Sequence, residues 1–349
     1  MKAKEIVLAG ATAFAVALSS TAVPEAAAQQ TYELKAGPSN VHIGHFHAAI
    51  KPALTINSGD TVVIDGVTHV DPALVERSGV VPPGDIPENH RAIYREVKDR
   101  GPSVHVLVGP IHVTGAEPGD VLEVRILDVE LGSTYGFNSQ LPYRGALPDE
   151  FTQVWQRFIR IDRQNKTAEV ARGVVVPVAR PFFGTMGVAP PPQMGRISSG
   201  PPGIHAGNLD NKDLGAGATL YMPVHVKGAL FSAGDPHAAQ GHGEVDLTAI
   251  ETNLRGRFQF IVRKDMKLRW PRAETPSHWI VMGLHEDLDE AMKIAVRETI
   301  DFITQRFPHL TRQEAYMIAS VAVDYHVTQV VDGTKGVHGM IPKSIFVSR

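Results

Sequence analysis

Apolar and polar residues alternate between tight turns over much of the chain from residue 51 to about residue 183, which predicts mostly strands in this part. Residues 82–99 are expected to form a loop followed by a short helix. The clearest run is VLEVRI at residues 121–126. Because successive side chains of a strand point to opposite faces, this spacing predicts a strand with one buried face. Turns that contain glycine and aspartate, SGD at 58–60 and GAEPGD at 115–120, precede such runs.

Helical periodicity begins only near the C-terminus. Apolar residues recur on one helical face over residues 288–303, with Asp287 and Glu290 as a cap-and-return pair at the start. Thr311 and Glu314 have the spacing of a capping box, which predicts a second helix. Strands first and helices late predict an α+β fold, with a β-rich, sandwich-like body of antiparallel or mixed sheets and C-terminal helices.

Charge and motif content exclude several classes of partner. The 349 residues carry a formal net charge of −3, and no basic cluster offers a surface for nucleic acid or a membrane. The short basic run KDMKLRWPR at 264–272 is interpreted as solvated strand and loop faces. No G-x-G-x-x-G follows a strand and no Walker sequence occurs, which argues against dinucleotide- and nucleotide-binding folds.

Residues 1–28 have the pattern of a secretory signal peptide. Lys2 and Lys4 supply the positive start, and residues 6–18 form an apolar run too short to span a bilayer. Small residues at 26–28 form a cleavage site, so the mature protein is expected to begin at Gln29 and to be periplasmic or secreted. An uncleaved membrane anchor is the alternative. Residues 29–349 are predicted to form a single unit.

The chain contains no cysteine. Disulfides, a thiol nucleophile and a cysteine-ligated zinc site are therefore excluded. Any metal must bind histidine, carboxylate, amide or backbone oxygen. Serine chemistry is also poorly supported, because no G-x-S-x-G motif occurs and Ser198-Ser199-Gly200 is too short a match to a serine amidase signature.

Two segments gather side chains that could bind a metal. In HIGHFH at 42–47, His45 and His47 point to one face of an extended chain and could share a metal, although 16 histidines make chance spacing the alternative. The segment GDPHAAQGHGE at 234–244 follows an apolar run and is richer in donors. Its glycines leave room for a ligand, and its donors suit a divalent cation. A surface loop without a ligand is the alternative.

A third segment, HAGNLDNKD at 205–213, closes a stretch dense in glycine and proline. We interpret residues 180–217 as a rigid, loop-rich part of a site, although a linker is the alternative. Asn208 and Asp210 could equally form a turn by binding backbone donors. His338 follows a further glycine-rich turn and, taken alone, is interpreted as structural.

Six segments spread over nearly the whole chain after residue 28 resemble the acetamidase/formamidase family. They are KPALTINSGD (51–60), GPIHVTGAEPGD (109–120), RPFFGTMGVAP (180–190), HAGNLD (205–210), GDPHAAQG (234–241) and GVHGMIPK (336–343). The resemblance implies that residues 29–349 are one catalytic unit that hydrolyses formamide, acetamide and similar short amides. It also implies a bound metal and a homo-oligomer.

Within this resemblance we infer roles from chemistry. Glu244 is the candidate general acid/base, and Asn208 or Gln240 would hold the amide substrate. The metal is a divalent cation, with zinc favoured and calcium as the alternative. The candidate ligands, more than one ion needs, are His45, His47, Asp210, Asp235, His237 and His242.

Two positions depart from the family pattern. His47 and His242 stand where relatives usually carry aspartate, in segments far apart in the sequence. Two changes of the same kind predict that these residues face one another across one metal site and shift its preference toward zinc. The departures also leave a second function open, an exported metal or small-ligand binding protein without turnover. Glu244 favours the enzyme.

Export is directly testable. Sequencing the N-terminus of the protein recovered from the periplasm or medium should give a start at or near Gln29, because the small residues at 26–28 precede it. A cytoplasmic protein that retains Met1 would contradict the assignment.

Overall fold

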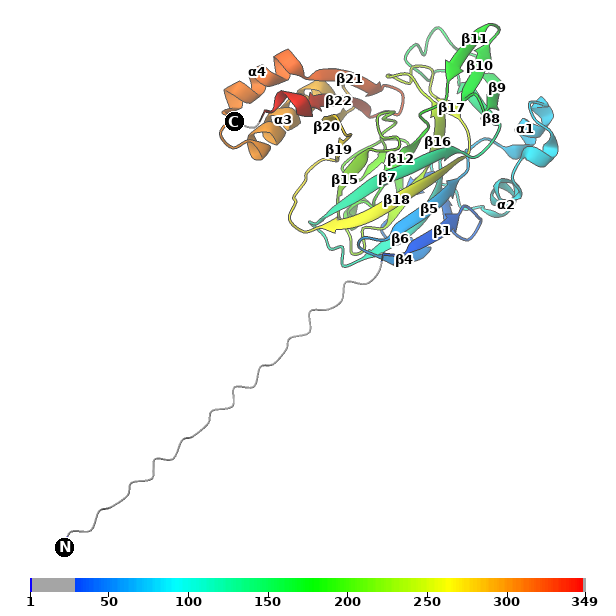
Figure 1. Ribbon diagram of the computed structural model, residues 1–349. Coiled ribbons are helices and arrows are strands. Elements are labelled where there is room, and N and C mark those ends of the chain that lie inside the picture. Colours follow the sequence, from blue (N-terminus) through cyan, green and yellow to red (C-terminus); the bar gives the residue numbers. More distant parts are fainter. Residues whose placement is uncertain (2–28, 348–349) are drawn as a thin grey trace.

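The structure is a computed structural model that describes Met1 and residues 29–347. The predicted signal peptide therefore lies, apart from Met1, outside the described residues. Two large sheets and a pair of short strands make up the body, and helices lie at its edges (Figure 1). Among the described residues, no helix is both long enough and apolar enough to cross a membrane.

The first sheet has nine strands. In spatial order they are β1 (Thr31–Lys35), β5 (Thr61–Gly66), β18 (Leu254–Arg263), β7 (Val121–Leu131), β15 (Thr219–Pro223), β19 (Arg272–Glu274), β20 (His278–His285), β22 (Lys335–Pro342) and β21 (Asp324–Gln329). All neighbouring pairs are antiparallel except β1 with β5. The predicted run at 121–126 is the start of β7, and the apolar residues of that run are buried.

The second sheet has eleven strands. The main path is β11 (Val174–Pro177), β10 (Thr167–Ala171), β9 (Trp155–Asp162), β8 (Tyr135–Gln140), β17 (Ile250–Glu251), β16 (Phe231–Ala239), β12 (Phe182–Gly187) and β14 (Ala206–Asn208). Strand β6 (Val106–Thr114) pairs with β16, β2 (Val41–Ile43) and β4 (Leu54–Asn57). The separate pair is β3 (His45–Phe46) and β13 (Ile197–Ser198).

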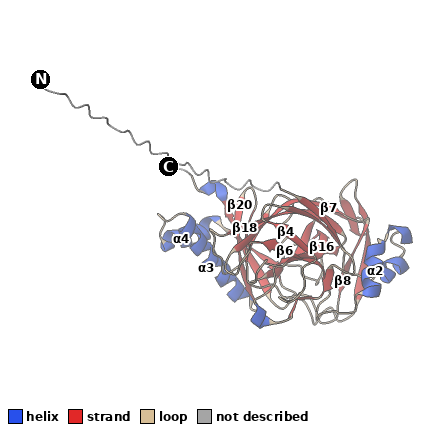
Figure 2. Cartoon of the chain, turned by 90° about the horizontal axis from the view of Figure 1, so that it is seen from below, coloured by secondary structure: helices blue, strands red, loops and turns tan. Residues whose placement is uncertain are grey.

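Helices occupy the periphery, as Figure 2 shows for α3 and α4 on one side of the body and α2 on the other. The helices are α1 (Pro72–Ser78), α2 (Glu88–Glu96), α3 (Leu288–Arg306) and α4 (Arg312–Ala322), with short 3-10 turns η1 (Pro83–Asp85), η2 (Pro192–Met194) and η3 (Lys343–Ile345). The β-rich α+β prediction with C-terminal helices is confirmed, although four strands, β19 to β22, also lie in that last part of the chain.

Helix α3 packs on β20 and β22 through a stripe of buried residues, Ala291, Ala295, Thr299 and Ile303. Their spacing of four is one face of a helix, which explains the periodicity seen in the sequence. The predicted capping box of α4 is confirmed in both directions.

At the start of α3 only half of the predicted cap-and-return pair forms. Asp287 caps the backbone N–H of Glu290, but the Glu290 carboxylate binds Lys293 at 2.6 Å instead of returning. The backbone N–H of Asp287 already donates to His285 Nδ1, which removes the donor that Glu290 would need.

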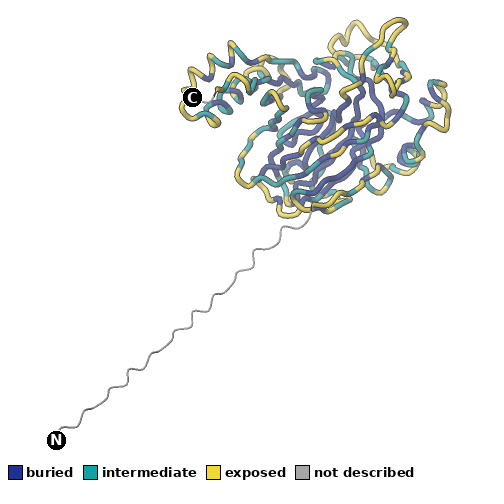
Figure 3. Tube along the Cα trace, in the orientation of Figure 1, coloured by how far each residue is buried: buried dark blue, intermediate teal, exposed yellow. Residues whose placement is uncertain are grey.

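Buried aromatic rings join the two sheets. Phe183 of β12 lies 5.3 Å from Phe258 of β18, and Phe231 of β16 lies 5.1 Å from Phe260 of β18, measured between ring centroids. All four rings belong to one core cluster, and Figure 3 shows the strands of this region as the continuous buried part of the chain. This contact fixes β12 and β16, the two strands from which the site is built, against the first sheet.

Removing one of these rings should lower the stability of the folded protein. Phe258→Ala leaves a cavity between the sheets and is expected to lower the free energy of unfolding by about 3–5 kcal/mol in urea titrations. The matched control is Phe151→Ala, because Phe151 is 48% exposed and its loss should change stability by less than about 0.5 kcal/mol. Equal stability of the two variants would contradict this account of the core.

Candidate functional site

Strand β16 carries the first two residues of the site. Asp235 and His237 are two positions apart, so their side chains lie on one face, and His237 pairs in register with Glu251 of β17. This register brings three donors together. His237 Nε2 lies 3.1 Å from Asp235 Oδ2 and 3.2 Å from Glu251 Oε1.

Gln240 determines the tautomer of His237. The Gln240 side-chain N–H donates to the Asp210 carbonyl at 2.7 Å, which leaves its Oε1 to accept from His237 Nδ1 at 2.9 Å. In a neutral imidazole the proton is then on Nδ1, and the lone pair of Nε2 faces two carboxylates. Such an arrangement requires either a proton or a cation at Nε2.

Asn208 organises a second group of carboxylates. Its side-chain amide donates to Asp210 Oδ2 at 2.5 Å and to Asp332 Oδ2 at 2.9 Å, while its oxygen accepts from Thr185 at 2.5 Å. Asp332 comes from the turn between β21 and β22, so this bond connects the two large sheets. The position of Asp210 relative to Asp332 therefore depends on one amide group.

Two histidines approach the same group from loops before β6 and after β5. His69 Nδ1 lies 3.7 Å from Asp235 Oδ1 and 3.9 Å from Glu251 Oε2. His105 Nε2 lies 3.9 Å from Asp235 Oδ1, and its Nδ1 is 2.9 Å from Ser199 Oγ. The distances at Asp235 and Glu251 exceed those of direct hydrogen bonds, so these rings face the carboxylates across a gap.

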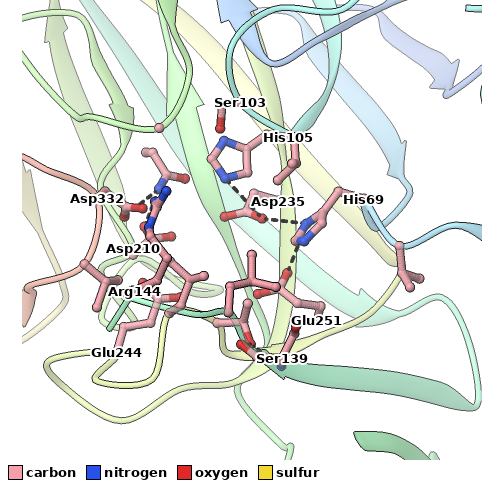
Figure 4. A pocket seen from close by; sticks show the side chains of 18 of the residues that line it. His69, Ser103, His105, Ser139, Arg144, Asp210, Asp235, Glu244, Glu251 and Asp332 are labelled. Atoms are coloured by element: carbon pink, nitrogen blue, oxygen red, sulfur yellow. Dashed lines mark hydrogen bonds and ion pairs between the residues drawn. The ribbon is translucent and has the colours of Figure 1, made fainter. Parts of the chain in front are cut away.

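These side chains line a pocket of about 680 Å³. Figure 4 shows His69, Asp235 and Glu251 on one side of it and Asp210, Glu244 and Asp332 on the other, all pointing inward. Asn208, His105 and Arg144 line it as well. The pocket thus has a strongly acidic interior within a protein of nearly balanced charge.

Burial determines how these groups ionise. It raises the pKa of Glu244 well above the usual carboxyl range and raises the pKa of Asp332 to about 6. Burial also raises the pKa of Asp210, with the charges of Glu244 and Asp332 adding to the effect. Burial disfavours charged His237, but Glu251 and Asp235 outweigh it and hold its pKa well above the ordinary value. Carboxylates that raise one another's pKa in this way are stabilised by a shared cation.

The donor set has the composition and the free atoms that a metal site needs. Two groups of donors each lie within 4.8 Å of one another, one of His69, Asp235 and Glu251, the other of Asp210, His237 and Glu244. The following atoms are buried without a hydrogen-bond partner: His69 Nδ1, Asp210 Oδ1, His237 Nε2, Glu244 Oε2 and Glu251 Oε2. Imidazole nitrogen with carboxylate oxygen is the donor chemistry of zinc and similar divalent ions.

Gly184 of β12 keeps the space between the two groups open. A Cβ atom at this position would lie 2.7 Å from both Asp235 Oδ2 and His237 Cε1, and it would collide with Asp210 Oδ1. Because such contacts are below the van der Waals limit, only glycine fits here. Two carboxylate oxygens and the His237 ring border this space.

The backbone of the site is strained at three of its carboxylates. Asp210, Asp235 and Glu244 have φ of 46°, 55° and 44°. Residues other than glycine rarely adopt this left-handed backbone conformation, and those that do concentrate at functional sites. The strain therefore marks the same residues that the geometry brings together.

Comparison with known proteins identifies the family of this chain. The family model described as "Acetamidase/Formamidase family" matches residues 29–200 and 197–348. The chain belongs to the acetamidase/formamidase family. A formamidase of Methylophilus methylotrophus is 31% identical over 307 residues, covering 66% of this chain and 74% of that protein. An acetamidase of Mycolicibacterium smegmatis is 27% identical over 202 residues, covering 41% and 49%.

Solved structures of the family share the fold. An acetamidase/formamidase from Thermoanaerobacter tengcongensis has a TM-score of 0.77 at 27% identity, covering 91% of this chain and 97% of that one. An acetamidase from Bacillus halodurans has a TM-score of 0.75 at 29% identity, covering 90% and 98%. The family resemblance expected from six sequence segments is confirmed.

Six of the residues selected from the sequence meet at this site. They are Asn208, Asp210, Asp235, His237, Gln240 and Glu244. The amide groups of Asn208 and Gln240 bind protein partners, which positions the neighbouring donors, and their contact with substrate stays a prediction.

The other three candidate ligands lie elsewhere. His45 is in β3, where its Nδ1 is 2.9 Å from the Ile43 carbonyl and 3.2 Å from Arg196. His47 is the first residue after this strand. His242 lies with His326 and His338. Within the described residues no hydrogen bond, ion pair or ring contact joins His47 to His242, which corrects the prediction that they face one another. His242 lies instead against His326 and His338, and His47 lies near His45.

Several site residues had no sequence signal. His69, His105, Glu251 and Asp332 are single polar residues within ordinary strand-end or turn segments. The register of β16 with β17 places Glu251 in the pocket, and the approach of the β21–β22 turn places Asp332 there. His69 and His105 reach the pocket from the loops after β5 and before β6.

Gly184 provides a test of the packing at this site. Gly184→Ala forces a methyl group among buried charged atoms and should lower the free energy of unfolding by about 1–3 kcal/mol, the usual cost of overpacking. Gly84→Ala is the matched control, because a Cβ at Gly84 meets nothing within 4 Å. Urea unfolding of both variants measures the difference, and an unaffected Gly184→Ala protein would rule out the close approach.

Proposed function

We propose that this protein is a metal-dependent amidase that hydrolyses short aliphatic amides, such as formamide and acetamide, to a carboxylate and ammonia. The observation that carries the proposal is the buried group of imidazoles and carboxylates whose free donor atoms converge on the pocket. Family membership and the names of the relatives, formamidase and acetamidase, support hydrolysis of linear amides.

Asp235, Glu251 and His237 are the residues that would hold the cation, with His69 as a further donor. Zinc is the favoured ion because two imidazoles and two carboxylates match its preferences, and calcium is the alternative. A bound divalent cation supplies Lewis acidity, which polarises the amide carbonyl and makes water a better nucleophile. Gln240 orients His237 for this purpose through the Nδ1 contact.

Glu244 is the residue proposed to move the proton. Its Oε2 atom is buried without a hydrogen-bond partner and points into the pocket beside Asp210 and His237. Hydrolysis must deliver a proton to the leaving nitrogen, since an amide anion is a poor leaving group. A carboxyl kept from bulk water and free of other partners can hold that proton and transfer it.

Asn208 holds carboxylates of the site, Asp210 among them, in position. Because Asn208 donates to Asp210 and Asp332 at the same time, it keeps two carboxylates from separating despite their repulsion. His105 and His69 lie on the opposite wall and limit the orientations available to a small substrate. The proposed chemistry thus uses residues held by both large sheets.

Ammonia release decides between an amidase and the alternative of an exported binding protein without turnover. Purified protein is incubated with formamide or acetamide, with and without a chelator, and ammonia is measured. The proposal expects ammonia formation that chelation abolishes and zinc restores. Binding of the amide without ammonia release would favour the binding protein. Export and homo-oligomeric assembly stay predictions beside this proposal.

Glu244→Gln tests the proton-transfer role. Loss of a positioned acid/base typically costs a factor of about 10² to 10⁴, so turnover should fall at least about a hundredfold. Glu130→Gln is the matched control, because it makes the same chemical change at a residue that is exposed on β7 and has no proposed role in the site. Circular dichroism checks the fold of both variants. Near-normal turnover of Glu244→Gln would exclude the role.

A further inference from the structure

Three histidines form a second cluster at the edge of the first sheet. His326 of β21 and His338 of β22 are directly paired across the hairpin, so their rings share one face, with centroids 5.3 Å apart. His242 comes from the loop after β16, and its ring centroid lies 4.5 Å from that of His326 and 5.1 Å from that of His338. One nitrogen of each ring lies within 4.8 Å of the other two.

Asp213 adds a carboxylate to these imidazoles. Its Oδ2 lies 3.3 Å from His338 Nε2 and 3.7 Å from His242 Nε2. Thr328 holds the other nitrogen of the His338 ring at 2.7 Å, which directs Nε2 toward Asp213. His338 is buried, whereas His242 and Asp213 are 25% and 18% exposed, so the cluster has a buried base and an opening to solvent.

We propose that His242, His326, His338 and Asp213 bind one divalent cation of the zinc class, at a site separate from the amidase pocket. Three imidazole nitrogens and one carboxylate oxygen complete the four ligands of a closed zinc site. Two of the histidines lie opposite one another on the β21–β22 hairpin, and backbone hydrogen bonds fix the loop that carries the third. The Gly243 N–H donates to the Thr328 carbonyl at 3.0 Å, and the Val330 N–H donates to the Gly243 carbonyl at 3.1 Å.

The cation would connect three segments that carry the pocket carboxylates Asp210, Glu244 and Asp332. Asp213 lies three residues after Asp210, and His242 lies two residues before Glu244. The β21–β22 hairpin carries both the paired histidines and, in its turn, Asp332. One ion bound here therefore clamps the ends of three segments whose other side chains line the amidase pocket, which is the role of a structural metal site.

The experiment compares zinc stoichiometry between variants. Full-length mature protein is stripped with a chelator and titrated with zinc alone, and bound zinc per chain is measured by mass spectrometry after desalting. Wild type should bind one equivalent more than His326→Ala and one more than His242→Ala. His309→Ala is the control with a matched loss of one imidazole, because His309 is exposed in the loop between α3 and α4, and it should match wild type.

The difference between proteins, not the total, decides the outcome. If the amidase pocket binds no zinc, the expected values are one for wild type and none for the variants, so failure of the proposed amidase metal does not affect this test. Equal zinc content in wild type and both cluster variants would overturn the proposal and leave the histidines as packed structural residues. If His326→Ala does not fold, His242→Ala still tests the proposal, because His242 lies in a loop.

A second measurement follows from linkage. Zinc that binds only the folded protein raises its Tm, and the rise should be smaller in His326→Ala and His242→Ala than in wild type and His309→Ala. An identical zinc-dependent shift in all four proteins would contradict the cluster as a metal site.

Discussion

Carboxylates buried side by side repel one another, and much of this structure serves to hold them together. The pocket contains Asp210, Asp235, Glu244 and Glu251 with few compensating positive groups. An uncompensated buried charge costs several kcal/mol, so such a group persists only when hydrogen bonds and a shared cation or proton balance it. The chain itself supplies part of this compensation. Asn208 donates hydrogen bonds to two carboxylates, and His237 lies against two others.

The scaffold explains how these residues reach one place. Strand β16 pairs with β6, β12 and β17, so it is central in the second sheet, and its buried face carries both Asp235 and His237. Packing of Phe231 and Phe183 against the first sheet leaves β12 and β16 little freedom to move. A rigid strand bearing polar residues between two apolar layers positions ligands more accurately than a loop does.

The sequence predicted the fold class and the donor-rich segment, because periodicity and local composition survive in the folded chain. Strand runs such as 121–126 and the capping box at Thr311 depend on neighbours within a few residues. Glu251 and His69 could not be found in this way, since their roles come from strand register and from loops far apart in the chain. His242 was selected from its segment as a ligand of this pocket, but it lies elsewhere. It stands in the donor-rich segment, yet the loop turns after Ala239 and directs its ring to the β21–β22 hairpin.

The left-handed backbone at Asp210, Asp235 and Glu244 has a consequence for how the gene can change over time. Glycine adopts this conformation without penalty, so replacement by glycine would relieve strain at each position while removing the carboxylate. Mutations that inactivate the pocket are therefore favoured by folding stability alone, and only selection for activity opposes them. A descendant of this chain freed from that selection should lose these three side chains early and keep its fold.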